Sequence, residues 1–448
     1  VGRGDIGTRT FGGDPYWVGL LGRAYIRGVH RGSKGRVATV AKHFPGHGGS
    51  DRLPDEEVAT VDKSLQELKR IELPPFFAIT RRDEGDDLAT TDALMSSHIR
   101  YRGFQGNIRQ FTAPISFDAQ GMRTILGLPE FAAWRERGLI VSDALGVPAV
   151  RKYYDPELRT FPHKQIAREA FLAGNDLLTL AQFDLRDHWP DQVRNIQETI
   201  IYFQEEYRTN PDFAARVDEA VARILHLKRR LYPQFTLEAI LVDPAVALQI
   251  AGQGQEQVYE IAQQALTLLY PHPEDLRENL PAPPRYDEDI LIFTDARQVR
   301  ECFSEDCPYF SPLPVDALEQ AILRLYGPEG TGQIDPTRIH SYSFTQLKEF
   351  LSNPLNGGTG QTAEIGRLIR EAEWIIIAMQ DVNLERYPAS DAVHLFLAQV
   401  GRPLYAARLV VFAFNAPYYL DTTEVSKLSA YFGLYSNCLL YTSPSPRD

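Results

Sequence analysis

The chain has 448 residues, of which 44% are hydrophobic, and its formal net charge is -12 at pH 7. A chain of this length exceeds what one hydrophobic core usually supports, so length and composition predict two domains. The acidic excess argues against nucleic acid or an anionic membrane surface as a partner. No segment approaches the roughly 20 consecutive apolar residues of a membrane-spanning helix.

The first half of the chain alternates short apolar runs with helical stretches, as a parallel β/α arrangement requires. Asp14 and Pro15 begin a predicted helix that reaches about His30. One face of this helix holds Trp17, Leu21 and Tyr25. Further helices are predicted over 64–70, 161–172 and 211–231, and a late strand over 177–180. The buried side of the last helix is expected to hold Val217, Val221, Ile224 and Leu227.

Two predicted strands of this half are followed by polar side chains. The β-prone run 37–41 precedes Lys42 and His43, and the run 139–142 leads to Asp143. Active sites of α/β barrels lie at the carboxyl ends of the strands, so we expect these side chains in one mouth. An aspartate there is a candidate nucleophile or base, or else a helix N-cap. Lysine beside histidine suits a polyhydroxylated ligand such as a sugar.

Histidines at 43 and 47 have the spacing of a helical metal pair. Pro45 and Gly46 lie between them and prevent a regular helix, so we predict no metal site. We expect His47 to brace the loop through a backbone hydrogen bond. His98, at the end of the apolar run 93–97, is either another residue of the mouth or a core histidine with satisfied hydrogen bonds.

The second half predicts another α/β unit. A helix over 245–265 is followed by a segment rich in proline and charge over 271–284, which is typical of a linker. Strands are predicted at 290–293, 374–379 and 409–414, separated by helical stretches.

Together these segments resemble glycoside hydrolase family 3, in particular its β-N-acetylhexosaminidase branch. The most specific motif is the Lys-His-Phe-Pro-Gly-His-Gly string at 42–48. Supporting motifs, in the family's order, are 7–12 with Asp14-Pro15, Ser96-Ser97-His98, Ser142-Asp143 and Ala173-Gly174-Asn175-Asp176. The resemblance implies an α/β fold with a partial TIM-type β/α barrel over 1–232, a connection over 233–284 and an α/β sandwich domain over 285–437. It implies no cofactor and no metal.

Residue-by-residue transfer from the family makes Asp143 the catalytic nucleophile. By the same transfer, Arg9, Lys42 and His43 bind the hydroxyl and N-acetyl groups of the sugar, and His98 is a further candidate for substrate binding.

The chain departs from the family's pattern where the acid should be. The branch usually carries an Asp-Ser/Thr-His segment after the 42–48 motif, whose histidine protonates the leaving oxygen, but residues 49–57 contain no histidine. Counting forward without gaps to the family-like segment 72–76 puts Asp55 at the histidine's position. The histidine dyad is therefore absent.

Three outcomes are physically open. Loop closure could desolvate a carboxylic acid and raise its pKa, in the arrangement of two carboxyls roughly 5 Å apart that retaining glycosidases use. Asp55 is the first candidate for this acid, with Glu56, Glu57 and Asp51 behind it. The acid could instead come from another loop or from the second domain, or it could be lost, leaving a sugar-binding protein. Acidic clusters are also common in solvated loops.

The chain ends and the cysteines add further expectations. The resemblance predicts that roughly three βα units, on the order of 100 residues at typical unit size, precede the first motif. Residues 438–448 look like a translated sequencing adapter. Cys302 and Cys307 then remain, too few for a disulfide framework or a zinc site, and they leave the compartment undecided. The resemblance favours secretion or the cell envelope, and the oligomeric state stays open.

The predicted function is that of a retaining exo-β-glycosidase that releases terminal N-acetylglucosamine from peptidoglycan- or chitin-derived oligosaccharides. The alternatives are a β-glucosidase or β-xylosidase of the same family, and a catalytically impaired carbohydrate-binding protein. A phosphorylase is disfavoured, because a carboxylate in place of a neutral histidine would repel phosphate.

Overall fold

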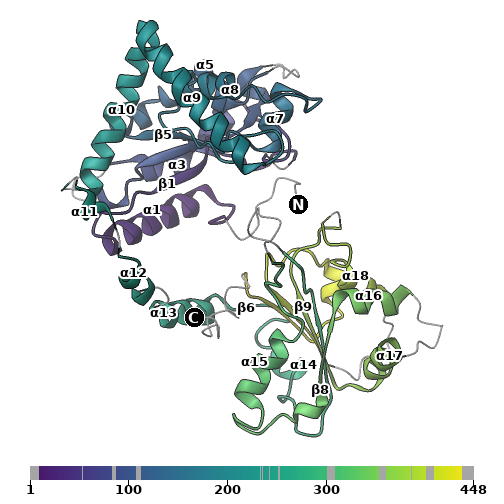
Figure 1. Ribbon diagram of the computed structural model, residues 1–448. Helices are drawn as coiled ribbons and strands as arrows, with labels where there is room; N and C mark the ends of the chain where they lie inside the picture. The colour runs from purple at the N-terminus through teal and green to yellow at the C-terminus, as the bar shows by residue number, and fades with distance from the viewer. Residues whose placement is uncertain are drawn as a thin grey trace. The chain divides into compact units, whose positions relative to one another are not determined.

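The computed structural model describes residues 10–52, 54–82, 87–106, 112–232, 234, 236–241, 243–250, 253–299, 308–352, 360–384, 386–399 and 408–435. The chain divides into two compact units, Val1–Asp243 and Pro244–Asp448 (Figure 1). Both units are α/β, and the predicted fold class, barrel-type βα units followed by an α/β sandwich, is confirmed. Among the described residues, no helix is both long and apolar enough to cross a membrane.

The first unit is built on parallel strands whose carboxyl ends finish level with one another. Its strands are β1 (Val40–Phe44), β2 (Ala59–Val61), β3 (Ala93–Ser96), β4 (Ile99–Tyr101) and β5 (Leu139–Ser142). One parallel sheet has the order β1-β3-β5, and a separate sheet pairs β2 with β4. Ser96 lies opposite Phe44 on one side and Ser142 on the other, so polar residues after these strands meet at one edge.

The strand predicted over 37–41 lies further along the chain. Pairing with β3 begins at Val40 opposite Ala93, so Lys42 and His43 lie inside β1 rather than after it. The side chains of β1 are mostly exposed or partly buried, and Phe44 alone is buried. The β-branched residues before Val40 favour a strand locally, but the position of β3 decides where pairing starts.

Helices cover the first unit. They are α1 (Pro15–Gly32), α2 (Leu65–Arg70), α3 (Leu73–Thr80), α4 (Arg102–Gln105), α5 (Ala119–Leu126), α6 (Ala132–Arg135), α7 (Pro148–Tyr154), α8 (His163–Leu172), α9 (Trp189–Thr209), α10 (Pro211–Leu231) and α11 (Leu237–Ile240). Asp14 caps α1 by accepting from the backbone nitrogen of Tyr16 at 2.9 Å. The helix α9 was not predicted.

One prediction about a helix face needs correction. In α1 the residues Trp17, Leu21 and Tyr25 are exposed, and the helix buries Gly19, Ile26 and His30. Val221, predicted on the buried side of α10, is exposed, whereas Phe213 and Ala220 are buried. Helical spacing identifies an apolar face, but the neighbouring elements determine which residues are covered.

Aromatic contacts organise the core of the first unit. Phe44, the last residue of β1, packs edge to face against Phe76 of α3 at 5.3 Å and against Phe131 at 5.6 Å between ring centroids. Trp134 is buried, and its indole nitrogen donates to the carbonyl oxygen of Thr91 at 2.7 Å. These contacts hold the end of β1 against α3 and so fix the position of the neighbouring His43.

The second unit is a single sheet with helices on both faces. Its strands, in sheet order, are β6 (Thr267–Tyr270), β11 (Ala430–Gly433), β10 (Arg408–Ala413), β9 (Trp374–Met379), β7 (Ile290–Thr294) and β8 (Ile339–Ser343). All neighbouring pairs are parallel except β6 with β11. The predicted strands appear as β7, β9 and β10. The strand β6 lies within the predicted connection 233–284 but pairs in this sheet.

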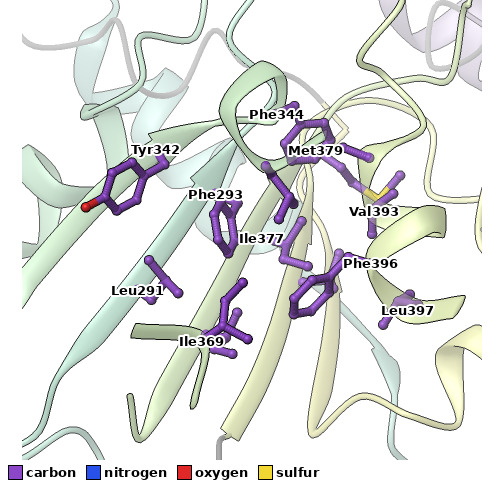
Figure 2. Close-up of a cluster of buried hydrophobic side chains, with 14 of the residues drawn as sticks. Leu291, Phe293, Tyr342, Phe344, Ile369, Ile377, Met379, Val393, Phe396 and Leu397 are labelled. Carbon is purple, nitrogen blue, oxygen red and sulfur yellow. The ribbon is translucent and has the colours of Figure 1, made fainter. Parts of the chain in front are cut away.

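The second unit has eight helices among its described residues, and those from α14 onward pack on the sheet. They are α12 (Pro244–Ile250), α13 (Gln255–Ala265), α14 (Leu276–Asn279), α15 (Ala317–Tyr326), α16 (Phe344–Ser352), α17 (Gln361–Glu371), α18 (Ala392–Gln399) and α19 (Thr422–Val425). The helix predicted over 245–265 is thus two helices. Figure 2 shows Phe293, Ile377 and Phe396 in the cluster formed with α16, α17 and α18. The helices α14 and α15 pack on the opposite face.

Candidate active site

Asp143 directly follows β5 and is held from both sides. Its backbone nitrogen donates to the carbonyl oxygen of Ser96 at 3.1 Å, which links it to β3. The preceding residue, Ser142, accepts at its Oγ from the backbone nitrogen of Thr179 at 2.9 Å. The Asp143 carboxyl accepts from the nitrogen of Ala144 at 2.8 Å, and its side chain is 20% exposed. Because Val147 occupies the N-cap of α7, the carboxyl is not that helix's cap.

His43 lies beside this carboxyl. The distance from His43 Nε2 to Asp143 Oδ2 is 3.6 Å, and the imidazole is largely buried. His47 packs edge to face on the His43 ring, with 4.9 Å between centroids. The structure therefore brings His43 and Asp143 together, as the strand ends predicted. Lys42 is exposed at the same end of β1, and Arg9 lies outside the described residues.

Asp55 belongs to the same electrostatic environment, although it comes from a different loop. Its backbone oxygen accepts from the nitrogen of Ala149 at 3.0 Å, which fastens the loop to α7. The residue is accessible to solvent, but the protein around its carboxyl desolvates the charge, and the negative charge of Asp143 adds to this effect. Together they raise the pKa of Asp55, while His98, His47 and Lys42 act in the opposite direction.

Asp51 and Glu57, two of the other candidate acids, are committed to other partners. Asp51 Oδ1 accepts from the backbone nitrogen of Thr60 at 2.7 Å. Burial alone would raise the pKa of Asp51, but the hydrogen bonds from Arg52 and Thr60 outweigh burial and lower it. Glu57 forms an ion pair with Arg52 at 2.8 Å. A carboxylate stabilised in its charged form is a poor proton donor, so the structure favours Asp55 over Asp51.

His98 is buried, unlike the partly exposed Asp143. The imidazole is buried, its Nδ1 is 2.7 Å from Ser116 Oγ, and its Nε2 is 3.0 Å from the carbonyl oxygen of Ala144. Since a carbonyl only accepts, Nε2 carries the hydrogen. Burial lowers the pKa of His98, in keeping with a neutral ring. Both ring nitrogens are thus engaged, and the structure does not support the prediction that His98 binds substrate directly.

The Ala-Gly-Asn-Asp motif supports the site from beneath, a role the sequence alone did not reveal. Asn175 accepts at Oδ1 from Ser96 Oγ at 2.7 Å and donates to the carbonyl oxygen of Ser116 at 2.9 Å. It therefore links β3 to the residue that bonds His98. The sequence held a hint of this role, since Asn175 and Asp176 directly precede the apolar run 177–180. Polar residues that are buried beside a strand require hydrogen-bond partners.

A cavity of about 900 Å³ adjoins these residues. His43, His47 and Gly48 line one side of it, and α1 contributes Ile26 and Val29 to the other. Neither Asp143 nor Asp55 lines the cavity, so it lies next to the two carboxyls rather than around them. In the part of the chain that the structure describes, no group of three or more His, Cys, Asp or Glu side chains could hold a metal ion. Cys302 and Cys307 fall outside that part.

Comparisons with known proteins agree with this arrangement. Two curated relatives are named beta-hexosaminidase: one from Hydrogenovibrio crunogenus is 28% identical over 171 residues, 38% of this chain and 42% of that protein. The other, from Xylella fastidiosa strain M23, is 33% identical over 154 residues, 34% of this chain and 40% of that protein. The chain thus spans less than half the length of these relatives.

Solved structures share the fold at low sequence identity. A glycoside hydrolase family 3 β-N-acetylglucosaminidase from Paenibacillus sp. FPU-7 is 20% identical, with a TM-score of 0.63 over 98% of this chain and 70% of that one. The β-glucoside phosphorylase BglX is 21% identical, with a TM-score of 0.64 over 98% of this chain and 68% of that one. At these identities the likeness concerns the fold.

A family model supplies the remaining comparison. Residues 2–227, half of the chain, match the glycosyl hydrolase family 3 N-terminal domain. The matched range contains Lys42, His43, Asp55 and Asp143, together with every strand of the first unit. This chain belongs to glycosyl hydrolase family 3.

Proposed function

We propose that the protein is a retaining exo-β-glycosidase that removes terminal β-linked N-acetylglucosamine from oligosaccharides derived from peptidoglycan or chitin. The observation that carries the proposal is the pairing of two carboxyls in different electrostatic settings. Asp143 lies at the end of β5 beside His43, and Asp55 has a pKa raised by desolvation and by Asp143. A carboxyl with a raised pKa in the electrostatic environment of a second carboxyl supplies the acid and the nucleophile that a retaining glycosidase needs.

The two carboxyls take complementary roles in this mechanism. Protonated Asp55 gives its proton to the glycosidic oxygen, so the aglycone leaves as a neutral alcohol while the Asp143 carboxylate bonds to the anomeric carbon. Ionised Asp55 then takes a proton from water, and the water oxygen displaces Asp143. Two displacements at one carbon retain its configuration. No metal or cofactor enters either step.

The N-acetyl sugar is proposed on three grounds. The first is the 42–48 motif of the β-N-acetylhexosaminidase branch, the second is the name of the curated relatives, and the third is the fold of the Paenibacillus enzyme. Lys42 and His43 supply several hydrogen-bond donors at the end of β1, and Arg9 is proposed as a third sugar-binding residue. The family resemblance favours secretion or the cell envelope as the compartment.

A carbohydrate-binding protein is the rival function, because residues 49–57 contain no histidine and the family's usual acid is missing. The two functions are separated by turnover. We expect the purified protein to hydrolyse aryl β-N-acetylglucosaminides faster than aryl β-glucosides. Faster hydrolysis of the glucoside would favour the β-glucosidase alternative, and a folded protein that binds N-acetylglucosamine without turnover of either substrate would support the rival.

The role of Asp55 is tested in the same assay. Asp55→Ala is expected to lose rate mainly on substrates with poor leaving groups, such as phenyl β-N-acetylglucosaminide, because an activated aryl oxide leaves without protonation. Azide should restore the rate on dinitrophenyl substrates, since it attacks the glycosyl-enzyme without needing a base. Equal losses on all leaving groups, with no rescue by azide, would remove Asp55 from this role.

A further inference from the structure

The loop between β1 and β2 carries both kinds of candidate functional group. His47 lies near its start, beside His43, and Asp55 lies near its end. Loops of this length are normally mobile unless their backbone is tied to a rigid element. This loop is tied at two points to the two-stranded β2–β4 sheet.

Tyr101 of β4 makes the first attachment. Its hydroxyl donates to the carbonyl oxygen of Gly46 at 2.6 Å, and the Tyr101 side chain is completely buried. Gly46 has φ of +119°, and a Cβ added there would lie 2.6 Å from the Cβ of Glu72. The buried Glu72 carboxylate pairs with Lys63. The turn between the two histidines is therefore held by a hydrogen bond on one side and by close packing on the other.

Asp51 makes the second attachment. Its backbone nitrogen donates to the carbonyl oxygen of Thr60 in β2 at 3.2 Å, and its Oδ1 accepts from the Thr60 nitrogen at 2.7 Å. Arg52 donates to the other carboxylate oxygen at 2.8 Å. This attachment lies four positions before Asp55, whose own backbone oxygen accepts from the nitrogen of Ala149 in α7 at 3.0 Å. The acid-bearing end is therefore held by β2 through Asp51 and by α7 through Asp55, whereas the Tyr101 attachment lies next to His47.

The sheet that receives both attachments is rigid. Thr60 lies opposite Arg100, and Val61 lies opposite Tyr101, in a parallel register. The outer residues of both strands, Ala59, Val61, Ile99 and Tyr101, are all fully buried. Closely packed interiors have low compressibility, so two attachments to one buried sheet define two fixed points of the loop.

We propose that the β2–β4 sheet positions the two ends of this loop independently, with Tyr101 setting the sugar-binding end and Asp51 setting the end that carries the acid. Both are positioning residues, because they act through Gly46 and through the loop backbone. This inference rests on the proposed glycosidase function. It reassigns Asp51 from candidate acid to attachment point.

Two substitutions separate the two attachments. Tyr101→Phe deletes one hydroxyl, and we expect the inhibition constant of free N-acetylglucosamine to rise about fivefold, a typical loss for one buried hydrogen bond. Turnover of dinitrophenyl and phenyl substrates should fall in equal proportion. Asp51→Ala should leave that inhibition constant unchanged and should slow phenyl β-N-acetylglucosaminide about tenfold more than the dinitrophenyl substrate, because only the former requires the acid.

Matched controls test whether any loss of packing has the same effect. Tyr154→Phe removes a second tyrosine hydroxyl, which donates to Glu169 at 2.6 Å. Asp155→Ala removes another aspartate that caps backbone nitrogens in a loop. Neither control should change the ratio of the two substrates or the inhibition constant. Asp51→Asn retains an acceptor for Thr60 and should recover most of the phenyl-substrate rate.

The outcomes of the inference and of the proposed function are distinguishable. Absence of turnover in the folded wild-type protein contradicts the glycosidase function itself. An active wild type in which Tyr101→Phe and Asp51→Ala change both readouts in parallel, or change neither, contradicts the two-attachment arrangement alone. Thermal unfolding of each variant shows whether it is folded at the assay temperature.

Discussion

At the scale of single residues, the arrangement depends on what surrounds three carboxyl groups. Asp143 receives one hydrogen bond from Ala144 and lies next to His43. Desolvation and the negative charge of Asp143 raise the pKa of Asp55, whereas Arg52 and Thr60 stabilise Asp51 in its charged form. The same side-chain chemistry therefore supports three different roles, in the manner of other paired carboxylates.

Replacing the proposed nucleophile should abolish turnover without abolishing binding. We expect Asp143→Asn to reduce kcat by about a thousandfold or more, since the covalent step has no other acceptor. Asparagine keeps the size of the side chain, so N-acetylglucosamine should bind with similar affinity in calorimetry. A variant that retains wild-type turnover would contradict the assignment of Asp143.

The pH dependence follows from the direction of the Asp55 shift. Asp143 must be ionised to attack, and Asp55 must be protonated to donate, so kcat/KM should be bell-shaped. Because the Asp55 pKa is raised, its protonated form persists to higher pH than for an ordinary aspartate, and activity is lost as pH rises through that pKa. Asp55→Ala should lose the alkaline limb on phenyl substrates, whose departure requires the acid. Persistence of that limb would point to another acid.

Phosphate should not replace water as the acceptor. After donating its proton, Asp55 is an anion beside the glycosyl-enzyme and repels a second anion. Reactions in phosphate buffer should therefore release the free sugar, which phosphorus NMR can distinguish from a sugar phosphate. Accumulation of the sugar phosphate would instead align this protein with its structural neighbour, the β-glucoside phosphorylase.

At the scale of elements, the site is held by motif residues that do not face it. The Asp176 carboxyl is fully buried, accepts from the nitrogen of Ile140 in β5 at 3.0 Å, and pairs with Arg216 and Arg223 of α10 at 2.9 and 3.1 Å. It thereby joins α10 to the strand that delivers Asp143. Sequence comparison flagged this motif, but the residues alone did not reveal that it connects a helix to a strand.

Removing Asp176 should destabilise the first unit strongly. Asp176→Ala removes the buried counter-charge of Arg135, Arg216 and Arg223 and leaves the last two only the exposed Glu219, and breaking a buried pair costs about 3–5 kcal/mol. Asp191→Ala, which removes a carboxylate from an exposed ion pair with Arg194, should change stability little. Chemical denaturation followed by fluorescence measures both variants. Equal effects from the two substitutions would contradict the role of Asp176.

At the scale of the whole molecule, the chain is two units with separate cores. The first unit contains every candidate functional residue that the structure describes, and the second is a largely parallel sheet covered by helices on both faces. The predicted boundary near 232 and the structural division after Asp243 differ by a short segment. Between residues 236 and 249, every side chain that the structure describes is exposed.

Limited proteolysis should cut first within this segment. Exposed backbone with few buried contacts opens more readily than the interior of either unit. Thermolysin, which prefers apolar residues, has Leu237, Ile240 and Leu241 available there. Mass spectrometry should identify early fragments that end between 236 and 249. Early cuts inside β3 or β9 would contradict the division into two units.

The sequence by itself located the strands that carry the candidate site residues, because strand periodicity and the residues next to a strand are local properties. It thus predicted Asp143 and His43 at one edge of a parallel sheet, and it predicted β7, β9 and β10 closely. Only the tertiary structure decided that His98 is buried with both ring nitrogens engaged, that Asp51 bonds to Thr60, and that β6 joins the second sheet. The physical reason is that burial, pKa and strand pairing depend on neighbours that are distant in the chain.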